Sequence, residues 1–285
     1  MKNRHEGLII EVAEIENSIK EKADYVNIRE YGVCSVTSVD IRDSSDGVLL
    51  GREKGKYVTF EFDKIYKIDD KDFDKLTDII SEYLRQYLSL CSEGRIIVVG
   101  VGNRNITADS IGPKTIDRII VTRGLEQTEF IDRSLFSSVC AICSDVFGIT
   151  GIESAEIIKG LVSVLQPAAV IVIDALATKS VSRLCKTVQI SDTSLTPGGG
   201  VGNDREKISS DKLGVPVISI GVPTVLEAES IIEKESDLKD FSDELIIIPS
   251  RIDDATTSGA KLIAFALNKA LHNGLDTNDI LKFLY

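Results

Sequence analysis

Histidine is scarce in this chain, with two residues among 285. His5 lies close to the first residue and His272 near the end of the last predicted helix. Triad hydrolases need an imidazole beside their nucleophile, and neither histidine follows a predicted strand. The motifs G-x-S-x-G, H-E-x-x-H and G-x-x-x-x-G-K-[ST] are also missing, and Gly100-x-Gly102 lacks the third glycine of a dinucleotide-binding turn. We therefore expect neither a histidine-based mechanism nor a cofactor or metal ion.

Cysteine is present in an odd number at low density, five residues in all, which is not the pattern of a disulfide scaffold. Cys140-x-x-Cys143 is a single pair with no second pair at zinc spacing. Residues three apart in a strand point to opposite faces, which suits neither chelation nor a disulfide. We interpret both as buried structural thiols.

Long apolar runs are missing too. No stretch approaches the ~18–20 apolar residues of a membrane helix, and acids interrupt the N-terminus where a secretory signal needs an apolar core. Lysine and arginine total 33 against 45 aspartates and glutamates, a net charge of -12 that repels phosphate backbones. We expect a cytoplasmic protein with no membrane or nucleic-acid partner, whose substrate is not held in a basic groove.

The first 93 residues are predicted to form a small elaboration on a larger core. Residues 11–24 fit a helix, and residues 72–90 fit a longer amphipathic helix. Three short segments between them are rich in β-formers and predict a small antiparallel sheet: Val33–Ile41, Gly47–Leu50 and Tyr57–Phe62.

Residues 94–285 carry continuous apolar runs, which are typical of strands buried on both faces. The predicted strands are Ile96–Gly100, Ala168–Ile173, Val215–Ile220 and Leu245–Ile248, with weaker candidates at Val139–Cys143 and Thr187–Ile190. The predicted helices are Pro113–Val121, Ser154–Leu165, Val225–Ile232 and Ile252–Leu271. This pattern predicts a three-layer α/β/α core with a mostly parallel sheet, packed with the N-terminal part into one structural domain.

Two aspartates stand out by position. Asp174 follows the apolar run of its strand, and Asp109 lies in the loop after Ile96–Gly100. Open α/β sheets build their sites at the carboxyl ends of strands, so a pair here could activate water and protonate a leaving amine without histidine. The competing interpretation is structural: Asp174 caps a turn, and Asp109 caps the helix that begins near Pro113.

A glycine-rich segment, Pro197–Asn203, follows the strand candidate around Val188. Its glycines permit positive φ and close approach of the backbone to a ligand, although no lysine is present to bind phosphate. A peptide backbone or an oxyanion could bind there equally well. The structural alternative is that the segment is only a long mobile loop with no ligand.

Together these segments resemble the germination protease family, which degrades small acid-soluble spore proteins. The matching stretches are Val99–Asn103, Thr107–Lys114, Val121–Arg123, Gly148–Ile158, Ile173–Ala177, Gln189–Thr193, Pro197–Asn203 and Gly214–Thr224. The resemblance implies an endopeptidase with a fold similar to hydrogenase-maturation proteases, a homotetramer and a zymogen. It places the two essential aspartates of an atypical aspartic peptidase on Asp109 and Asp174. We expect substrate-binding or supporting roles for other motif residues: Asn103, Asn105, Glu153, Asp192, Gly198, Gly199, Gly200 and Asn203.

The chain departs from the family pattern in two places. The family's processing region reads Thr-Asp-Leu-Ala-x-Glu-Ala, whereas here the stretch from Arg4 reads Arg-His-Glu-Gly-Leu-Ile-Ile-Glu-Val-Ala. The segment 231–244 is also shorter than the family's insert between the last two core strands. Two other functions stay open: a metal-dependent peptidase of the maturation type, and a non-catalytic binding or regulatory member of the family.

Overall fold

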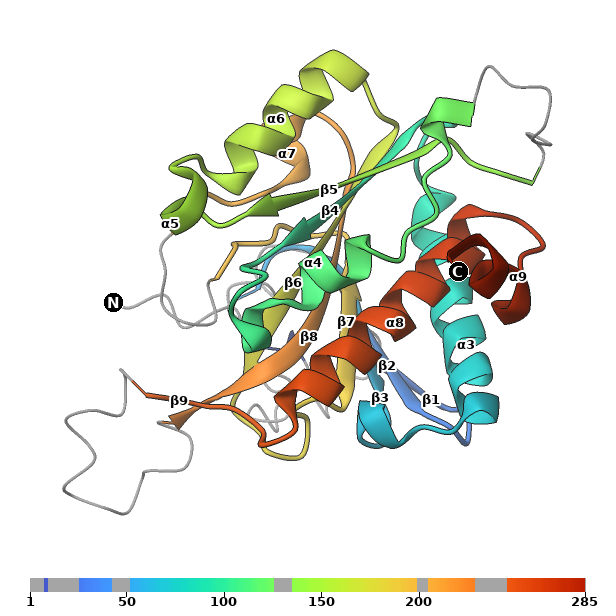
Figure 1. Cartoon of the computed structure of the whole chain (residues 1–285), viewed down its shortest axis with the longest axis vertical. Coiled ribbons are helices and arrows are strands. Elements are labelled where there is room, and N and C mark those ends of the chain that lie inside the picture. Colours follow the sequence, from blue (N-terminus) through green and yellow to red (C-terminus); the bar gives the residue numbers. More distant parts are fainter. Residues whose placement is uncertain are drawn as a thin grey trace.

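The computed structural model describes residues 8–9, 26–42, 52–125, 135–198, 205–228 and 245–284. These residues form a central sheet with helices on both faces (Figure 1), so the α/β class predicted from the apolar runs is confirmed. The predicted helix at 11–24 and the predicted strand Gly47–Leu50 lie outside the described residues.

Nine strands make up the sheet, in the order β1-β2-β3-β7-β8-β6-β4-β5, with β9 paired to β8. The strands are β1 (Val26–Glu30), β2 (Ser35–Ile41), β3 (Gly55–Glu61), β4 (Ile96–Val101), β5 (Val139–Asp145), β6 (Ala169–Thr178), β7 (Thr187–Ser191), β8 (Val217–Glu227) and β9 (Ile246–Ile247). The helices are α3 (Asp70–Leu88), α4 (Ile111–Ile116), α5 (Phe147–Thr150), α6 (Ser154–Leu165), α7 (Ser210–Leu213), α8 (Ile252–Leu271) and α9 (Thr277–Leu284). Three 3-10 turns complete the order: η3 (Ile65–Lys67), η4 (Thr107–Asp109) and η5 (Arg123–Leu125).

The N-terminal strands belong to the main sheet. β2 and β3 pair antiparallel, as predicted, but β3 also pairs antiparallel with β7 of the core. The expectation of a separate small sheet is therefore wrong, because the free edge of β3 finds its partner in a strand far along the sequence. β8, β6, β4 and β5 run parallel to one another, and the other pairings are antiparallel. The sheet is therefore mixed rather than mostly parallel, because the N-terminal strands and β7 join it.

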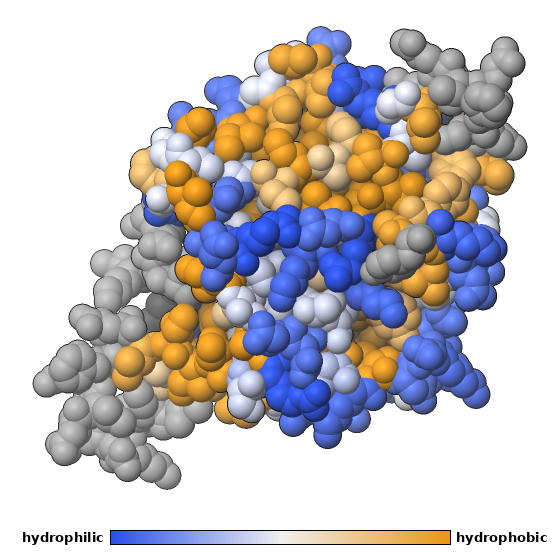
Figure 2. All heavy atoms as spheres, viewed as in Figure 1, coloured by the Kyte–Doolittle hydropathy of each residue, from blue (hydrophilic) through white to orange (hydrophobic). Residues whose placement is uncertain are grey.

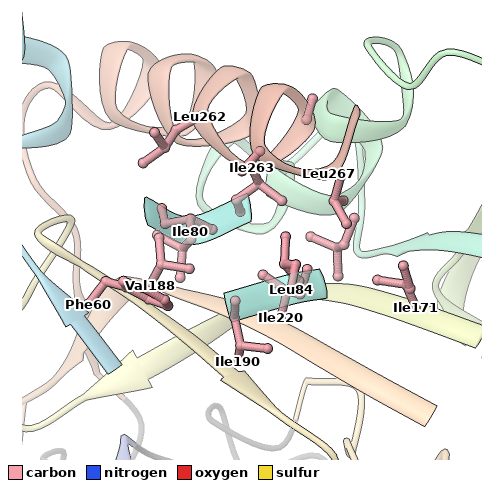
Figure 3. Close-up of a cluster of buried hydrophobic side chains, with 14 of the residues drawn as sticks. Phe60, Ile80, Leu84, Ile171, Val188, Ile190, Ile220, Leu262, Ile263 and Leu267 are labelled. Atoms are coloured by element: carbon pink, nitrogen blue, oxygen red, sulfur yellow. The ribbon is translucent and has the colours of Figure 1, made fainter. Parts of the chain in front are cut away.

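Alternate residues of the central strands face two different apolar clusters. Val98 of β4 and Ile171 of β6 belong to the larger cluster, which α3 and α8 cover (Figure 3). Their neighbours Val99 and Val172 face the smaller cluster under α6 and α7. Strands with this pattern need helices on both faces, which explains why their sequences read as continuous apolar runs.

The helix predictions hold best for the long periodic segments. Helices α6 and α8 begin and end as predicted, α3 lies within two residues of its predicted bounds, and α4 is shorter than expected. The predicted helix Val225–Ile232 is wrong in its described part, because β8 continues to Glu227. Val225 pairs with Ala177 of β6, and this pairing outweighs the helical spacing of the sequence.

The cysteines are free, and the Cys140–Cys143 pair forms no disulfide. Both are only half-buried, which corrects the expectation of buried thiols. The reason is that β5 is an edge strand of the sheet and lacks a neighbour on one side. Among the helices that the structure describes, none is long and apolar enough to cross a bilayer.

Candidate active site

Helix α4 packs with almost no space against the ends of β4 and β6. A Cβ on Gly112 would overlap the carbonyl oxygen of Val101 and stand 2.6 Å from that of Ile173. A Cβ on Gly100 would overlap the carbonyl oxygen of Gly112 itself. Only glycine permits this approach of backbone to backbone, and it brings the loop before α4 next to the strand that carries Asp174.

Asp109 closes the loop between β4 and α4. Its Oδ2 accepts a hydrogen bond of 2.7 Å from the backbone N–H of Asn103. Gly102 has φ +114, and a Cβ there would overlap the carbonyl oxygen of Asp109. Ser110 precedes α4 as its N-cap residue and makes no side-chain cap bond, so Asp109 does not have the capping role of the structural alternative.

The environment of Asp109 favours its protonated form. Partial burial raises the pKa of this carboxyl and the charge of Asp145 raises it further, against the opposing effect of the Asn103 hydrogen bond. A carboxyl whose pKa is raised in this way is better suited to act as an acid than one whose pKa is lowered.

Asp174 is 1% exposed and lies inside β6, four residues before the strand ends. Its Oδ1 accepts from the N–H of Ala175 at 2.8 Å, and its Oδ2 accepts from the N–H of Gly198 at 3.3 Å. Since β6 continues to Thr178, no turn follows for Asp174 to cap. The preceding residue, Ile173, pairs with Gly100 of the parallel neighbour β4, so the two aspartates lie beside adjacent strands.

The supporting residues predicted from the motifs occupy different places. Gly198, with φ +67, contacts Asp174 directly through its N–H. Asp192 directly follows β7 instead and lies beside the start of β3, where its Oδ1 accepts from the N–H of Lys56 at 2.7 Å. Gly199, Gly200 and Asn203 lie outside the described residues.

The remaining predicted residues shape the loops around the aspartates. The Oδ1 of Asn103 accepts from the N–H of Asn105 at 2.8 Å, and Asn105 is exposed. Glu153 is the N-cap residue of α6, where it forms a capping box with Glu156. Its carboxylate also pairs with Arg205 at 3.4 Å.

Asp145 is a residue of this region that the sequence analysis missed. It ends β5, pairs with Val101 of β4, and holds φ +58, which is rare for a residue with a side chain. Backbone strain of this kind concentrates at functional sites. Its position after the weaker strand candidate was the available signal, but only the pairing of β5 with β4 shows that its charge acts on Asp109.

Histidines and clusters of metal-binding side chains are the groups that the alternative mechanisms would use. His272 is fully buried against Phe136, with its Nε2 3.1 Å from the carbonyl oxygen of Ile120. Burial lowers the pKa of this imidazole, so it is held neutral in the core. No set of three or more histidine, cysteine, aspartate or glutamate side chains among the described residues could hold a metal ion.

Two cavities among the described residues are lined by side chains other than the two aspartates. One of about 480 Å³ lies against β1, β2, β3 and α3, and one of about 710 Å³ lies between α6 and α7. Neither is lined by Asp109 or Asp174.

Comparison with known proteins gives the chain relatives over most of its length. A model of the germination protease family matches residues 5–241. A germination protease from Clostridium perfringens (strain ATCC 13124) is 35% identical over 98% of this chain and 92% of its own length. One from Bacillus subtilis (strain 168) is 39% identical over 76% of this chain and 60% of its own length. The alignment with the Clostridium perfringens protein spans 316 positions, so that relative has residues without a counterpart among the 285 here.

Among solved structures, a NiFe hydrogenase maturation protease from Thermococcus kodakarensis matches 65% of this chain and 98% of its own, with 19% identity and a TM-score of 0.38. The family is established by the sequence matches alone. Because the family model covers most of the chain and relatives at 35–39% identity cover three quarters of it or more, the chain belongs to the germination protease family.

Proposed function

We propose that this peptidase of germination activates water with Asp109 and Asp174 acting as a pair. The observation that carries the proposal is their contrast. Both lie beside adjacent parallel strands, but the half-buried Asp109 accepts one backbone hydrogen bond and has a pKa raised by burial, while the fully buried Asp174 accepts two backbone hydrogen bonds. Titratable groups whose environments differ in this way are suited to opposite roles.

The roles follow from these environments. Asp174 takes a proton from a water molecule as the water oxygen attacks the peptide carbonyl carbon. Asp109 gives its proton to the nitrogen of the leaving amine as the carbon–nitrogen bond breaks. The two carboxyls then exchange protons with solvent to restore the starting state, so the reaction consumes one water and releases an acid and an amine.

The substrate class that we propose is the small acid-soluble spore proteins. The support is family membership. We therefore place the enzyme in the forespore or spore core, together with these substrates. Homotetramer assembly and activation from a zymogen belong to the same proposal, and the solution mass before and after incubation tests both.

The metal-dependent alternative makes a different prediction for a cleavage assay. Incubation with an acid-soluble spore protein, with and without a chelator, separates the candidates. Cleavage that resists the chelator supports the aspartate pair, and cleavage that the chelator stops supports a metal peptidase. A chain that leaves the substrate intact under both conditions is a binding or regulatory protein.

The aspartates are tested by replacing each with asparagine, which keeps the size of the side chain but cannot transfer a proton. We expect Asp109→Asn and Asp174→Asn each to lower kcat about 10²–10⁴-fold, with the double variant scarcely worse. Asp192→Asn is the control, because its hydrogen bond to Lys56 is structural and asparagine can accept it. Full turnover by either single variant would contradict the proposal.

Thermal unfolding of Asp109→Asn separates loss of chemistry from loss of fold. A folded-state pKa that is raised above 3.8 makes the native protein bind protons more readily than the unfolded chain, so stability falls as pH rises through that window. The Asp109→Asn substitution removes this loss of stability, because asparagine does not titrate. At neutral pH we expect an inactive variant whose Tm equals or exceeds that of the unmodified protein.

A further inference from the structure

The loop between β4 and η4 holds Asp109 by two backbone contacts. The N–H of Asn103 donates to the Oδ2 of Asp109 at 2.7 Å, and the N–H of Asp109 donates to the carbonyl oxygen of Ile106 at 2.9 Å. The three residues between Asn103 and Thr107 are exposed, and Ile106 is 54% exposed although it is apolar. Apolar packing therefore does little to fix this loop, so its polar contacts carry most of the anchoring.

Arg104 directly follows Asn103 and attaches the loop to two neighbouring elements. Its Nη1 donates to the Oδ2 of Asp117 at 2.6 Å, and its Nη2 donates to the Oδ1 of the same carboxylate at 3.0 Å. Nη2 also lies 3.4 Å from the carbonyl oxygen of Pro113 and 3.5 Å from the Sγ of Cys143. One planar guanidinium thus joins the loop to α4 and to β5, in a forked geometry that lysine cannot reproduce.

The attachment point on α4 is rigid, because Gly112 packs this helix directly against the backbone of β4 and β6. Asp117 is the C-cap residue of α4. A carboxylate at the C-terminus of a helix is unfavourable for the helix dipole, so the helix itself does not explain an aspartate there. The bidentate pair with Arg104 does explain it.

The pair between Arg104 and Asp117 lies at the surface. The two side chains are 48% and 47% exposed, and hydrophilic residues form a band over α4 at the centre of the face shown in Figure 2. Solvent screens a pair of this exposure, so it contributes little to the free energy of unfolding. Its effect is therefore expected on the position of the exposed loop and not on the Tm.

The position of the loop matters because it affects the acidity of Asp109. Burial raises the pKa of Asp109, the hydrogen bond from Asn103 lowers it, and the charge of Asp145 raises it. Arg104 is the neighbour of Asn103 in the chain, so a loop that is released from α4 takes the Asn103 N–H away from the carboxyl. Loss of that hydrogen bond raises the pKa of Asp109 further.

The other charged groups on the elements around Asp109 keep their own contacts when Arg104 is replaced. They are Asp145 of β5, Asp174 of β6, Lys114 of α4 and Asp253 of α8. Asp174 accepts from backbone N–H groups, and Lys114 donates to Thr256 of α8 at 2.7 Å. A change in the titration of Asp109 after substitution of Arg104 therefore reports on the Asn103 hydrogen bond.

We propose that Arg104 is a positioning residue for Asp109, which holds the loop on α4 and β5 so that the Asn103 N–H stays on the carboxyl. This inference rests on the proposed function, in which Asp109 supplies the proton to the leaving amine. Arg104 itself does not touch the reacting atoms. Its loss changes how well, and at which pH, Asp109 delivers its proton.

The pH dependence of kcat/KM and amide hydrogen exchange without substrate, both on the full-length protein, test the proposal. We expect Arg104→Gln and Asp117→Asn each to lower the maximum of kcat/KM about two- to fivefold and to move its alkaline limb to higher pH. The double variant should be no worse than either, because both substitutions break the same pair. Arg104→Lys should recover part of the loss, and exchange of the peptide that contains Asn103 should be faster in Arg104→Gln.

Arg42→Gln is the matched control. It breaks another exposed arginine–aspartate pair, with Asp40 at 3.1 Å, directly after β2 and far from β4 in the order of the sheet. Surface substitutions of this kind change stability little. The pH profile and the exchange of this variant should match those of the unmodified protein.

The results distinguish a failure of this inference from a failure of the proposed function. If the unmodified protein cleaves its substrate, Asp109→Asn does not, and Arg104→Gln matches Arg42→Gln in both measurements, Arg104 has no positioning role while the proposed function stands. An alkaline limb that stays in place while kcat/KM falls would also overturn the inference, because the ion pair would then be structural only. If the unmodified protein cleaves nothing, the proposed function fails and the role of Arg104 in it fails too.

Discussion

The parallel half of the sheet and the antiparallel half are built on different patterns. Every residue of β4 is buried, and β6 and β8 are nearly as enclosed, because all three are interior strands of the parallel half. By contrast, four of the five residues of β1, the edge strand of the antiparallel half, are exposed. A strand enclosed on both faces leaves only its ends open to solvent. This is consistent with a candidate site toward the C-terminal ends of β4 and β6, with Asp109 in the loop after β4 and Asp174 inside β6.

The antiparallel half contributes support for the site at a distance. Asp192, at the end of β7, accepts a hydrogen bond from Lys56 of β3, which fixes the chain before it continues to Gly198. A substitution that destabilises this half should therefore weaken activity without ending it. A substitution near the ends of β4 and β6 should lower both stability and activity.

The largest difference between the halves is expected for buried apolar residues. Ile171 of β6 is fully buried, and Ile171→Ala should lower the free energy of unfolding by about 2–5 kcal/mol. Ile28 of β1 is 63% exposed, and Ile28→Ala should change it by no more than about 0.5 kcal/mol. Urea unfolding measures both. Equal losses would show that the two halves do not differ in the way described.

A smaller effect is expected where α4 meets the strand ends. Gly112→Ala places a Cβ on the backbone of Val101 and should cost about 1–3 kcal/mol, with a fall in activity because the loop of Asp109 shifts. Gly160→Ala is the matched control on α6, where no atom lies within 4 Å of the added Cβ. That variant should be as stable or more stable by up to about 1 kcal/mol. Similar Tm values for the two variants would contradict the close packing.

The smallest effect concerns the charge at the end of β5. Asp145 raises the pKa of Asp109, so Asp145→Asn should lower that pKa. If Asp109 supplies the proton, the alkaline limb of the plot of kcat/KM against pH moves to lower pH. Asp145→Gly removes the same charge and also relieves the φ of +58, so it separates charge from strain. An unchanged alkaline limb in both variants would show that Asp145 does not act on the pKa of Asp109.

Much of the fold could be predicted because apolar patterning is local. The runs at Ile96–Gly100 and Ala168–Ile173 and the periodicity of α8 mark buried elements without reference to any partner. The errors arise where pairing decides. β1 has no apolar pattern because it is an exposed edge, and the end of β8 resembles a helix until its pairing with β6 and β9 is known.

The positions of the two aspartates were predictable only in part. Asp109 follows the strong strand signal of β4, whereas Asp174 lies inside β6, because pairing with β8 extends β6 to Thr178. The strained backbone of Asp145 and the ion pair between Arg205 and Glu153 could not be predicted, because they depend on the order β6-β4-β5 and on which loops meet beyond it.

The pairing of β3 with β7 has a consequence for how the protein folds during its synthesis on the ribosome. Residues 62–186 separate Glu61 from its partner Thr187, so β3 emerges long before the strand that covers its edge. At roughly 5–20 residues per second, the wait is on the order of ten seconds. During that time the nascent chain presents an unpaired edge rich in β-formers, which is a template for pairing with other chains. We expect a fragment that stops before β7 to need a chaperone or to aggregate, although each of its strands is paired in the complete fold.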